Sequence, residues 1–305
     1  MPSSFRAPAG YRFEPATLSA AAGIHTLIGA SERELYGRVQ TDLSHVVANL
    51  SLPGLDPRRD ALVARDAAGE VVGWAWVKFG RRCAVDVHPA HTGRGLGSAL
   101  LDWAEERARQ FGARELGQTV ADLDTAAAGL LRARGYAPTA QQWQLQYSLS
   151  EDPGQVESPS GVTFRPFRPQ DAHDVYEVCE DAFAFSQTRR RSYEEWSELT
   201  IKRPVFVPEL SPLAFDGGEL VGLLIAFENP DGTEGYVDQL AVREDHRGRG
   251  IAKALLFTTF RGFHRRGRST TTLFTHSKLS ALSLYEHLGM TVRSSDTVYH
   301  GDLRR

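Results

Sequence analysis

Two short glycine-rich segments have the composition of an anion-binding turn. Val242 to Gly250 reads VREDHRGRG, and Val87 to Gly95 reads VHPAHTGRG. Each segment follows a strand-like apolar run and precedes a run with helical spacing of apolar residues. Glycines there let the backbone turn sharply and approach a ligand, and the free N–H groups of the first helical turn then face an anion with help from the helix dipole. Both segments therefore predict sites for a pyrophosphate group.

The C-terminal turn carries more positive charge than the N-terminal one. It reads Arg247-Gly248-Arg249-Gly250-Ile251-Ala252, in which the two arginines either add charge to the site or are simply solvated. The matching N-terminal stretch reads Thr92-Gly93-Arg94-Gly95-Leu96-Gly97, with Thr92 in the place of Arg247. Losing one charge at the edge of the turn weakens the attraction for an anion without closing the site.

The chain is an internal duplication. Gly69 to Gly73 (GEVVG) reappears as Gly218 to Gly222 (GELVG), and Leu130 to Gly135 (LLRARG) reappears as Leu284 to Gly289 (LYEHLG). Only two copies occur and each has the size of a domain, which indicates a tandem duplication and not a solenoid. A turn-rich insertion at 229–234 in the second copy accounts for the change in spacing between the repeated segments.

A polar stretch separates the two copies. Residues 148–161 contain two prolines and no apolar periodicity, which is typical of a linker. We predict an N-terminal domain over residues 1–148, a linker over 149–161 and a C-terminal domain over 162–305.

The same order of elements is predicted in each copy. A short strand and helical stretches precede a β-hairpin, at 61–79 in the first copy and at 213–227 in the second. The next strand leads through the glycine-rich turn into an amphipathic helix that ends near Gly112 or Gly267. A strand, a short helix and a final strand close each copy. This order predicts an α/β fold in which a mixed, mostly antiparallel central sheet is flanked by helices.

Composition and charge exclude several classes of protein. The 305 residues are 41% hydrophobic and 24% charged, which is ordinary for a globular protein. A net charge of −3 argues against a broad nucleic-acid-binding surface. Cys83 and Cys179 lie in no metal-ligand spacing and cannot form a disulfide scaffold, so we expect no metal and a cytoplasmic protein. Residues 1–10 lack the apolar core of a signal peptide, and the most apolar stretch, 220–227, is too short to cross a membrane.

The C-terminal motif resembles a known enzyme family. Leu240 to Ala252 (LAVREDHRGRGIA), followed by Ser280 to Met290 (SALSLYEHLGM), is similar to the GNAT family, the GCN5-related N-acetyltransferases. Both copies resemble this family, and the tandem layout is similar to that of mycothiol synthase and related bacterial two-domain members. The resemblance implies two tandem GNAT-like domains, acetyl-CoA as the co-substrate and a primary amine as the acceptor.

The resemblance also implies where acetyl-CoA binds. Its pyrophosphate would lie on the turn at 247–252, next to Lys253, and its pantetheine arm would pair with the strand end like an added β-strand. The strand-end residues implied in the second copy are Leu240, Ala241 and Val242. The residues implied in the first copy are Val85, Val87, Gly93, Arg94, Gly95, Leu96 and Gly97.

Acetyl transfer to an amine needs a base for the amine and an acid for the departing thiolate. Tyr285 matches the family's tyrosine position, and a phenol with a pKa of about 10 can donate a proton there, although a core aromatic is the alternative. Asp238 shares a predicted strand with Leu240 and Val242, and alternation places it on their face as a candidate base; a solvated carboxylate is the alternative. Further candidates for the base are Glu228, Glu180 and Tyr236.

The chain departs from the family pattern at three positions. Lys278 stands where many members have asparagine before the last helix, which puts the usual CoA contact there in question. In the first copy, Leu131 aligns with Tyr285 and Thr92 aligns with Arg247. Leucine cannot donate a proton to a thiolate. We therefore predict a degenerate N-terminal domain and a catalytic C-terminal one.

The region before the C-terminal motif is also polar. The arginine run 189–191, with Tyr193 and Trp196, lies where GNAT proteins place acceptor-side helices, so it either meets an acidic acceptor or forms a solvated face. His246 and His276 flank the motif, and we expect both to be structural.

These observations predict a cytoplasmic N-acetyltransferase that moves an acetyl group from acetyl-CoA to a primary amine of a small molecule. No nucleic acid and no membrane is expected as a partner. The layout alone suggests a cysteinyl amino-sugar acceptor of the mycothiol type. The alternative function is a non-catalytic acyl-CoA-binding or sensing protein in which neither copy turns over. Thiol release from acetyl-CoA with a panel of amines, compared with binding alone, distinguishes the two.

Overall fold

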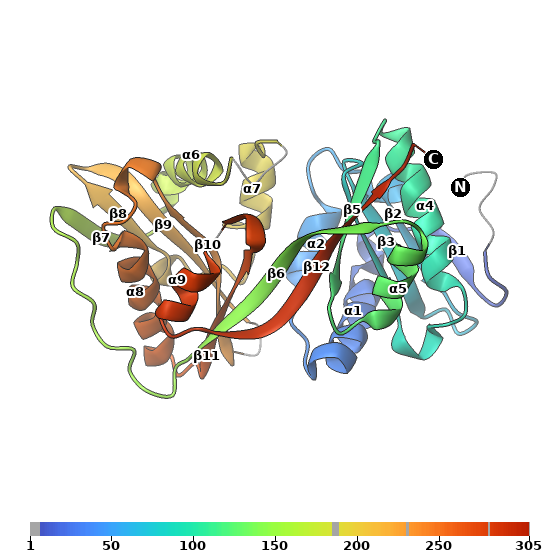
Figure 1. Ribbon diagram of the computed structural model, residues 1–305, viewed down its shortest axis with the longest axis horizontal. Helices are drawn as coiled ribbons and strands as arrows, with labels where there is room; N and C mark the ends of the chain where they lie inside the picture. Colours follow the sequence, from blue (N-terminus) through green and yellow to red (C-terminus); the bar gives the residue numbers. More distant parts are fainter. Residues whose placement is uncertain (1–6, 185–188, 230–231, 280, 305) are drawn as a thin grey trace. The chain divides into compact units, whose positions relative to one another are not determined.

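The chain folds into two compact units, each built around one copy of the repeat (Figure 1). The computed structural model describes residues 7–184, 189–229, 232–279 and 281–304. The N-terminal unit consists of Met1–Gln142 and Ser294–Arg305, and the C-terminal unit consists of Trp143–Arg293.

The N-terminal unit has a mixed sheet with helices on both faces. Its strands are β1 (Arg12–Pro15), β2 (Ala61–Arg65), β3 (Val71–Lys78), β4 (Arg82–Val87), β5 (Glu115–Ala121), the first part of β6 (Ala137–Ser148) and most of β12 (Thr291–Asp302). Its helices are α1 (Ala21–Tyr36), α2 (Leu43–Leu50), α3 (Pro57–Asp60), α4 (Leu96–Gln110) and α5 (Thr125–Ala133). The strand order is β1-β2-β3-β4-β5-β12-β6, with parallel pairing between β4 and β5 and antiparallel pairing from β1 to β4 and between β5 and β12.

The C-terminal unit repeats this plan. Its strands are the second part of β6, β7 (Val162–Pro166), β8 (Pro212–Asp216), β9 (Glu219–Glu228), β10 (Glu234–Val242) and β11 (Thr270–His276). Its helices are α6 (Ala172–Phe183), α7 (Tyr193–Leu199), α8 (Ile251–Arg265) and α9 (Leu282–His287). The strand order is β6-β11-β10-β9-β8-β7, in which β10 and β11 are parallel and the pairs from β10 to β7 are antiparallel.

Strand alternation divides the apolar residues of the C-terminal unit between two cores. Along β9, Leu224 and Ala226 pack with α8 and α9, whereas Leu223 and Ile225 pack with α6 and α7. Because successive side chains of a strand point to opposite faces, the sheet is covered on both sides. The predicted mixed, mostly antiparallel sheet flanked by helices is confirmed.

The last strand of the chain belongs to the N-terminal unit. β12 pairs with β5 over Asp296–Asp302 and Glu115–Ala121, so it supplies the backbone hydrogen bonds that β5 needs along one edge. Residues 294–305 therefore lie outside the unit that the predicted 162–305 boundary assigns to them. In the middle of the chain the division falls inside β6 and not after residue 148. Residues 149–161 form neither helix nor strand.

The predicted turns occur where the sequence places them. Both hairpins form, and α4 and α8 end two residues before Gly112 (φ 76°) and Gly267 (φ 73°), which adopt the left-handed conformation of a helix end. At the ends of the insertion, the Asn229 amide donates to the Glu234 carbonyl at 3.1 Å. Residues 230 and 231 of this insertion, and Ser280 of the second motif segment, lie outside the described residues.

Gly235 is a position where the fold has no room for a side chain. A Cβ atom there would lie 2.4 Å from a ring atom of Phe263 on α8. We expect Gly235→Ala to lower the free energy of unfolding by about 1–3 kcal/mol, because the helix or the ring must move. Urea unfolding followed by circular dichroism measures this loss.

Gly129→Ala is the matched control for this substitution. Gly129 lies within α5, and a Cβ there meets nothing within 4 Å. The same added methyl group should raise helix propensity and stabilise by up to about 1 kcal/mol. Equal effects of the two substitutions would contradict this account of β10 and α8.

Candidate active site

The glycine-rich turn of the C-terminal unit has the geometry of an anion cradle. Gly248 (φ 76°) and Gly250 (φ 83°) are left-handed, and Gly250 is the residue at which α8 begins. A side chain at either position would be strained, because positive φ is unfavourable for residues with a Cβ atom. The turn thus requires glycine at both positions, and Ile251 behind it is fully buried against the sheet.

The backbone N–H groups of this turn are free to bind a ligand. The first bond of α8 runs from the Ala254 amide to the Gly250 carbonyl at 3.0 Å. Within the described ranges, the amides from Gly248 to Lys253 have no hydrogen-bond partner. Unpaired N–H groups at the start of a fifteen-residue helix attract an anion, so the turn fits a pyrophosphate.

The N-terminal unit contains the same turn. Gly93 (φ 73°) and Gly95 (φ 84°) match the two C-terminal glycines closely, and α4 starts with a bond from the Ala99 amide to the Gly95 carbonyl. A proline ring lies near each turn: Pro8 is 3.6 Å from a Cβ built on Gly95, and Pro159 is 3.9 Å from one built on Gly250. The two copies therefore differ in charge at this turn and not in backbone shape.

The arginines of the C-terminal turn are not equivalent. Arg249 donates to Asp216 at 2.8 Å and to the Ser160 carbonyl at 3.2 Å, so its charge is already paired. Arg247 donates through Nε to the Val242 carbonyl at 3.3 Å, and its charge has no carboxylate partner among the described residues. Arg247 is thus the arginine that adds charge to the turn. His246 contacts Asp245 and Asp216, which fits the structural role predicted for it.

The two parallel strands next to the turn separate halfway along their length. β10 and β11 pair from Glu234–Thr270 to Val237–Leu273, and the register contains no later pair, although β10 continues to Val242 and β11 to His276. The backbone groups of β10 that face β11 beyond Val237 are therefore available to an added strand, as the pantetheine arm requires. Leu240, Ala241 and Val242 lie in this stretch.

A β-bulge in β10 overturns the predicted orientation of Asp238. Val237 pairs with Ala226, but Gln239 pairs with Ile225, so Asp238 is an extra residue in the strand. Such an extra residue reverses the alternation beyond it. Leu240 and Val242 pack on the α8 side, whereas the groups that interact with Asp238 lie on the α6 and α7 side. The expectation that Asp238 shares their face is wrong for this reason.

The environment of Asp238 makes it a plausible proton acceptor. Burial raises the pKa of its carboxyl to about 6, although Arg203, Arg191 and the Gln239 amide favour the charged form. A carboxyl group with a pKa near 6 is largely ionised at neutral pH, and it can hold a proton transiently during the reaction. The sequence did not predict Arg203 as a neighbour of Asp238. The Arg203 guanidinium lies over the Phe227 ring, 4.6 Å from its centroid. No local motif marks an arginine in that loop.

Gln239 anchors the bulge to both acceptor-side helices. Its Oε1 atom accepts hydrogen bonds from the Cys179 thiol of α6 at 2.8 Å and from the Trp196 indole of α7 at 3.0 Å. Two donors at one atom fix the orientation of the amide, so its NH₂ group is left to face the Asp238 carboxylate. Burial raises the pKa of Cys179 to about 12, which keeps this thiol a donor.

Tyr285 lies on the other face of the sheet, in the core that contains Val237 and Leu273. Only 8% of its surface is exposed, and burial raises the pKa of its phenol to about 12. Its hydroxyl has no hydrogen-bond partner in the described parts of the chain. The phenol thus holds its proton at physiological pH and has it available for an acceptor. Tyr285 and Asp238 flank, from opposite faces, the place where the two strands separate.

Two of the other candidate bases are in ion pairs, and the third is a phenol that keeps its proton. Glu228 pairs with Arg266 at 3.1 Å and with Arg268 at 3.2 Å. Glu180 is fully buried and pairs with Arg191 at 2.6 Å. Burial raises the pKa of Tyr236 above its usual range. None of these three groups is as well placed to receive a proton as Asp238.

The arginine run is used within the fold. Arg189 pairs with Glu195, Arg190 pairs with Asp181 and Glu177, and Arg191 pairs with Glu180. These pairs tie the segment before α7 to α6 and α7, so the run is neither a bare solvated face nor a set of free cations. Lys278 is exposed, and its amide donates to His276 at 3.2 Å.

The corresponding part of the N-terminal unit is built differently. β3 and β4 pair in unbroken register, so β4 has no bulge, and its pairing with β5 covers only Arg82–Gly117 and Cys83–Gln118. Leu131, at the position of Tyr285, is buried in an apolar cluster. This unit still holds a carboxyl that the motif comparison overlooked: Asp86 accepts from the Trp74 indole at 2.7 Å, and burial raises its pKa to about 6.

Two general findings concern the described residues as a whole. They contain no group of three or more His, Cys, Asp or Glu side chains that could hold a metal ion. None of the helices in those ranges combines the length and the apolarity that crossing a membrane demands.

Comparison with known proteins places these features in a family. The model of the acetyltransferase (GNAT) family matches residues 27–136 and 172–290, one match in each copy. A mycothiol acetyltransferase of Streptomyces scabiei is 30% identical over 224 residues, 71% of this chain and 70% of the relative. A mycothiol acetyltransferase of Pseudarthrobacter chlorophenolicus is 27% identical over 271 residues, 86% and 83% of the two chains.

Solved structures agree with this assignment. A GCN5-related N-acetyltransferase from Sphaerobacter thermophilus superposes with a TM-score of 0.79 at 28% identity, over 98% of each chain. A tandem GNAT protein from the clavulanic acid biosynthesis pathway shares the fold, with a TM-score of 0.75 over 97% of this chain and 99% of its own, at 18% identity.

The fold and the site define an acyl-CoA-dependent N-acyltransferase with two tandem domains of one fold. The chain belongs to the acetyltransferase (GNAT) family, which its sequence motifs predict. Its function is the transfer of an acetyl group to an amine of a small molecule.

The left-handed turn generates a prediction about donor binding. Gly250→Val should weaken acetyl-CoA binding by at least about tenfold, because a β-branched residue disfavours φ 83° and disorders the free amides. Isothermal titration calorimetry on the folded variant measures the loss. Gly267→Val is the matched control, since Gly267 has a similar φ of 73° at the far end of α8 and nothing within 4 Å. Equal affinities of the two variants would mean that the phosphates bind elsewhere.

Proposed function

We propose that the C-terminal unit performs the acetyl transfer, with Tyr285 as the acid and Asp238 as the base. One observation carries the proposal: these two side chains lie on opposite faces of the sheet where β10 and β11 stop pairing. A thioester placed at the end of the pairing would have the phenol on one side and the carboxylate on the other. That arrangement keeps the proton donor and the proton acceptor apart.

Each residue has one task in this proposal. Asp238 takes a proton from the neutral amine of the acceptor as the new C–N bond forms, and Tyr285 gives its proton to the sulfur as the C–S bond breaks. Asp238 then releases its proton to solvent and Tyr285 takes one up. The net result is one amide, one thiol and no change in the total number of protons. Gln239 positions Asp238 through its bonds to α6 and α7. Unpaired N–H groups of β10 offer hydrogen bonds to the carbonyl oxygen.

Acetyl-CoA is the proposed donor, bound at Gly248–Lys253 and along Leu240–Val242. The fit rests on six unpaired amides and on two left-handed glycines whose missing side chains leave room for phosphates. Arg247 supplies the uncompensated charge. Because the residues present suffice for this binding, the proposal includes no metal.

The proposed acceptor is a mycothiol-type amine, a cysteinyl amino-sugar. Support comes from the relatives that are named mycothiol acetyltransferase and that cover most of this chain. A panel of amines that includes cysteinyl amino-sugars, with thiol release from acetyl-CoA as the readout, tests this. Binding of acetyl-CoA without thiol release for any amine would instead favour the non-catalytic alternative.

The N-terminal unit is proposed to hold CoA without turnover or to remain empty. Its turn keeps the backbone geometry of the C-terminal one, but Thr92 replaces Arg247 and its hydroxyl donates to the Pro89 carbonyl. Leu131 offers no proton to a sulfur atom. The poised carboxyl of Asp86 therefore has no acid to work with in that unit.

The assignment of the acid predicts the behaviour of Tyr285→Phe. Turnover with chemistry rate-limiting should fall about 10- to 1000-fold, the usual scale of acid–base assistance, while acetyl-CoA affinity stays within about twofold. Stopped-flow thiol release and calorimetry measure the two quantities. Gly95→Val, which damages the N-terminal turn, is the comparison. Full activity of the tyrosine variant together with inactivity of a folded Gly95 variant would show that the chemistry belongs to the N-terminal unit and not to the C-terminal one.

The raised pKa of Asp238 predicts a pH profile. The carboxylate must be ionised to accept a proton, so kcat/KM should decline as the pH falls through about 6, the pKa of this group in the folded protein. Asp238→Asn should lower kcat/KM about 100-fold and remove this acidic limb. A limb near pH 6 that survives in the asparagine variant would show that another group controls it.

A further inference from the structure

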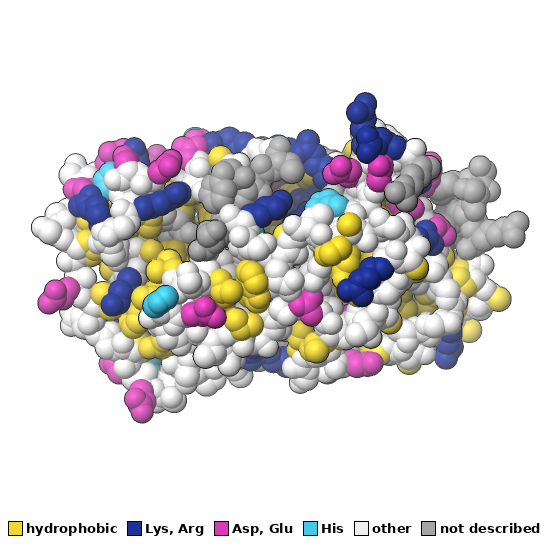
Figure 2. Space-filling view, in the orientation of Figure 1, with side chains coloured by type: hydrophobic (Ala, Val, Ile, Leu, Met, Phe, Trp, Pro, Cys, Tyr) yellow, Lys and Arg dark blue, Asp and Glu magenta, His cyan; other side chains and the backbone are white. Residues whose placement is uncertain are grey.

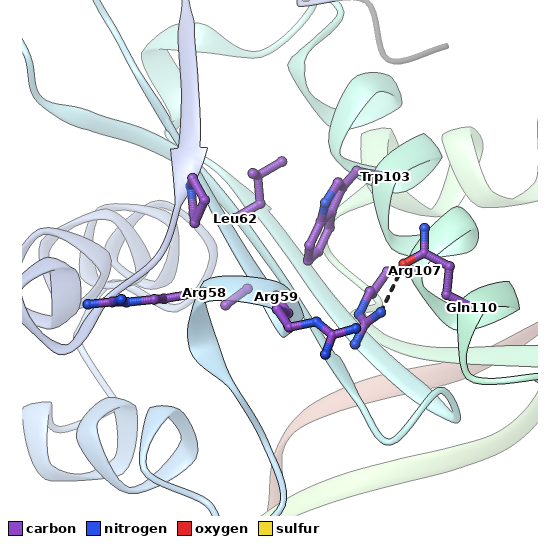
Figure 3. A pocket seen from close by; sticks show the side chains of 8 residues that line it. Arg58, Arg59, Leu62, Trp103, Arg107 and Gln110 are labelled. Atoms are coloured by element: carbon purple, nitrogen blue, oxygen red, sulfur yellow. Dashed lines mark hydrogen bonds between the residues drawn. The ribbon is translucent and has the colours of Figure 1, made fainter. Parts of the chain in front are cut away.

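The N-terminal unit contains a cavity that the acetyl-transfer site does not use. It has a volume of about 280 Å³ and lies between the end of β1, the short helix α3 and the second half of α4 (Figure 3). Arg107, which lines it, is eleven residues beyond Leu96, so it lies about 16 Å along α4 from the glycine-rich turn. A ligand in this cavity would therefore be separate from CoA bound at that turn.

The floor of the cavity is apolar. Leu62 and Trp103 are 2% and 6% exposed and belong to the apolar core beneath α4, and Pro15 closes one side. In Figure 3 the Trp103 indole stands edge-on between Leu62 and Arg107. A planar or branched apolar group of small size would complete this surface. The volume lies just below the usual range for ligand pockets, which suits a compact metabolite and not a nucleotide.

One wall carries positive charge that the protein neutralises only in part. Arg107 donates to Asp60 through Nε at 2.8 Å and through Nη2 at 2.6 Å, and to Gln110 through Nη1 at 2.8 Å. The second carboxylate oxygen of Asp60 accepts from the Asp56 amide at 2.8 Å. Asp60 is thus fully used in compensating Arg107, and Arg107 keeps one free N–H on each of its terminal nitrogens.

Arg59 supplies a second guanidinium without a counter-charge. Its side chain has no ion-pair or hydrogen-bond partner in the part of the chain that the structure describes, and it is exposed. Figure 3 shows Arg59 extending toward Arg107, whereas the guanidinium of Arg58 points the opposite way. The guanidinium groups of Arg59 and Arg107 repel each other, and the one carboxylate of this group, Asp60, already pairs with Arg107. A bound anion would relieve this repulsion. The cavity therefore has one uncompensated positive charge beside an apolar floor.

We propose that this cavity binds a small organic acid, with the carboxylate held by Arg59 and Arg107 and the apolar body against Trp103 and Leu62. Planar guanidinium groups match the two oxygens of a carboxylate, and hydrogen bonds between ionised partners are the strong ones. A single negative charge suits the one uncompensated guanidinium that extends toward Arg107, which favours a monocarboxylate over a doubly charged phosphate ester. Such a site would make the N-terminal unit a binding module for a second ligand, independent of the chemistry proposed above.

Benzoate is the probe that tests this site on the full chain. Saturation-transfer NMR and calorimetry should detect benzoate binding, and the uncharged benzyl alcohol should bind at least about tenfold more weakly, because it lacks the carboxylate. Phenyl phosphate should bind no more tightly than benzoate. The absence of a benzoate signal at about 20 mM would overturn the proposal, and so would a preference for phenyl phosphate or equal binding of benzyl alcohol.

Two arginine variants locate the binding. Arg59→Ala should weaken benzoate binding at least about tenfold, since it removes the uncompensated charge. Arg58→Ala, a neighbour of the same charge and exposure whose guanidinium points away, should change the affinity less than about threefold. Unaltered thermal unfolding of both variants confirms that the fold is intact. Equal affinities of wild type and Arg59→Ala would show that benzoate binds elsewhere and would overturn the assignment.

Discussion

The candidate site depends on where two neighbouring strands stop sharing hydrogen bonds. β10 and β11 are paired up to Val237 and Leu273, and β10 then gains one extra residue before its antiparallel pairing with β9 resumes. Ending the pairing leaves backbone groups for a ligand, and the extra residue places Leu240 and Val242 on the α8 face, opposite the groups that interact with Asp238. Both features come from the same few residues. In a strand of regular register, Asp238 would share a face with Leu240 and Val242.

The duplicated half shows that the glycine-rich turn can occur without the strand irregularities of the candidate site. The N-terminal unit keeps the turn, with glycine φ angles within a few degrees of those in the second copy. Its β4 strand runs in unbroken register with β3, and an apolar side chain, Leu131, fills the phenol position. The geometry proposed for binding and the geometry proposed for catalysis are thus separable in this fold, because the first belongs to a turn and the second to strand irregularities.

Much of the fold was predictable because it rests on local patterns. Glycines that need positive φ, hairpin turns and helix ends are each fixed within a few residues, and the predicted turns at Gly95 and Gly250 form as expected. The bulge at Asp238 was not predictable, since it depends on how β9 and β10 pair and leaves the alternation of residue types almost unchanged. The ion pairs of the arginine run and the packing of Arg203 over Phe227 likewise depend on segments that are distant in sequence.

The position of β12 affects how this protein folds during its synthesis. Seven residues of β5 in the first unit find their antiparallel partners in the last strand of the chain, almost two hundred residues later. During synthesis, the sheet of the first unit stays incomplete until the ribosome has finished the second. A gene cut at residues 149–161 would therefore not release two self-sufficient halves. Because β12 of the second copy completes the sheet of the first unit, the two copies depend on each other for folding.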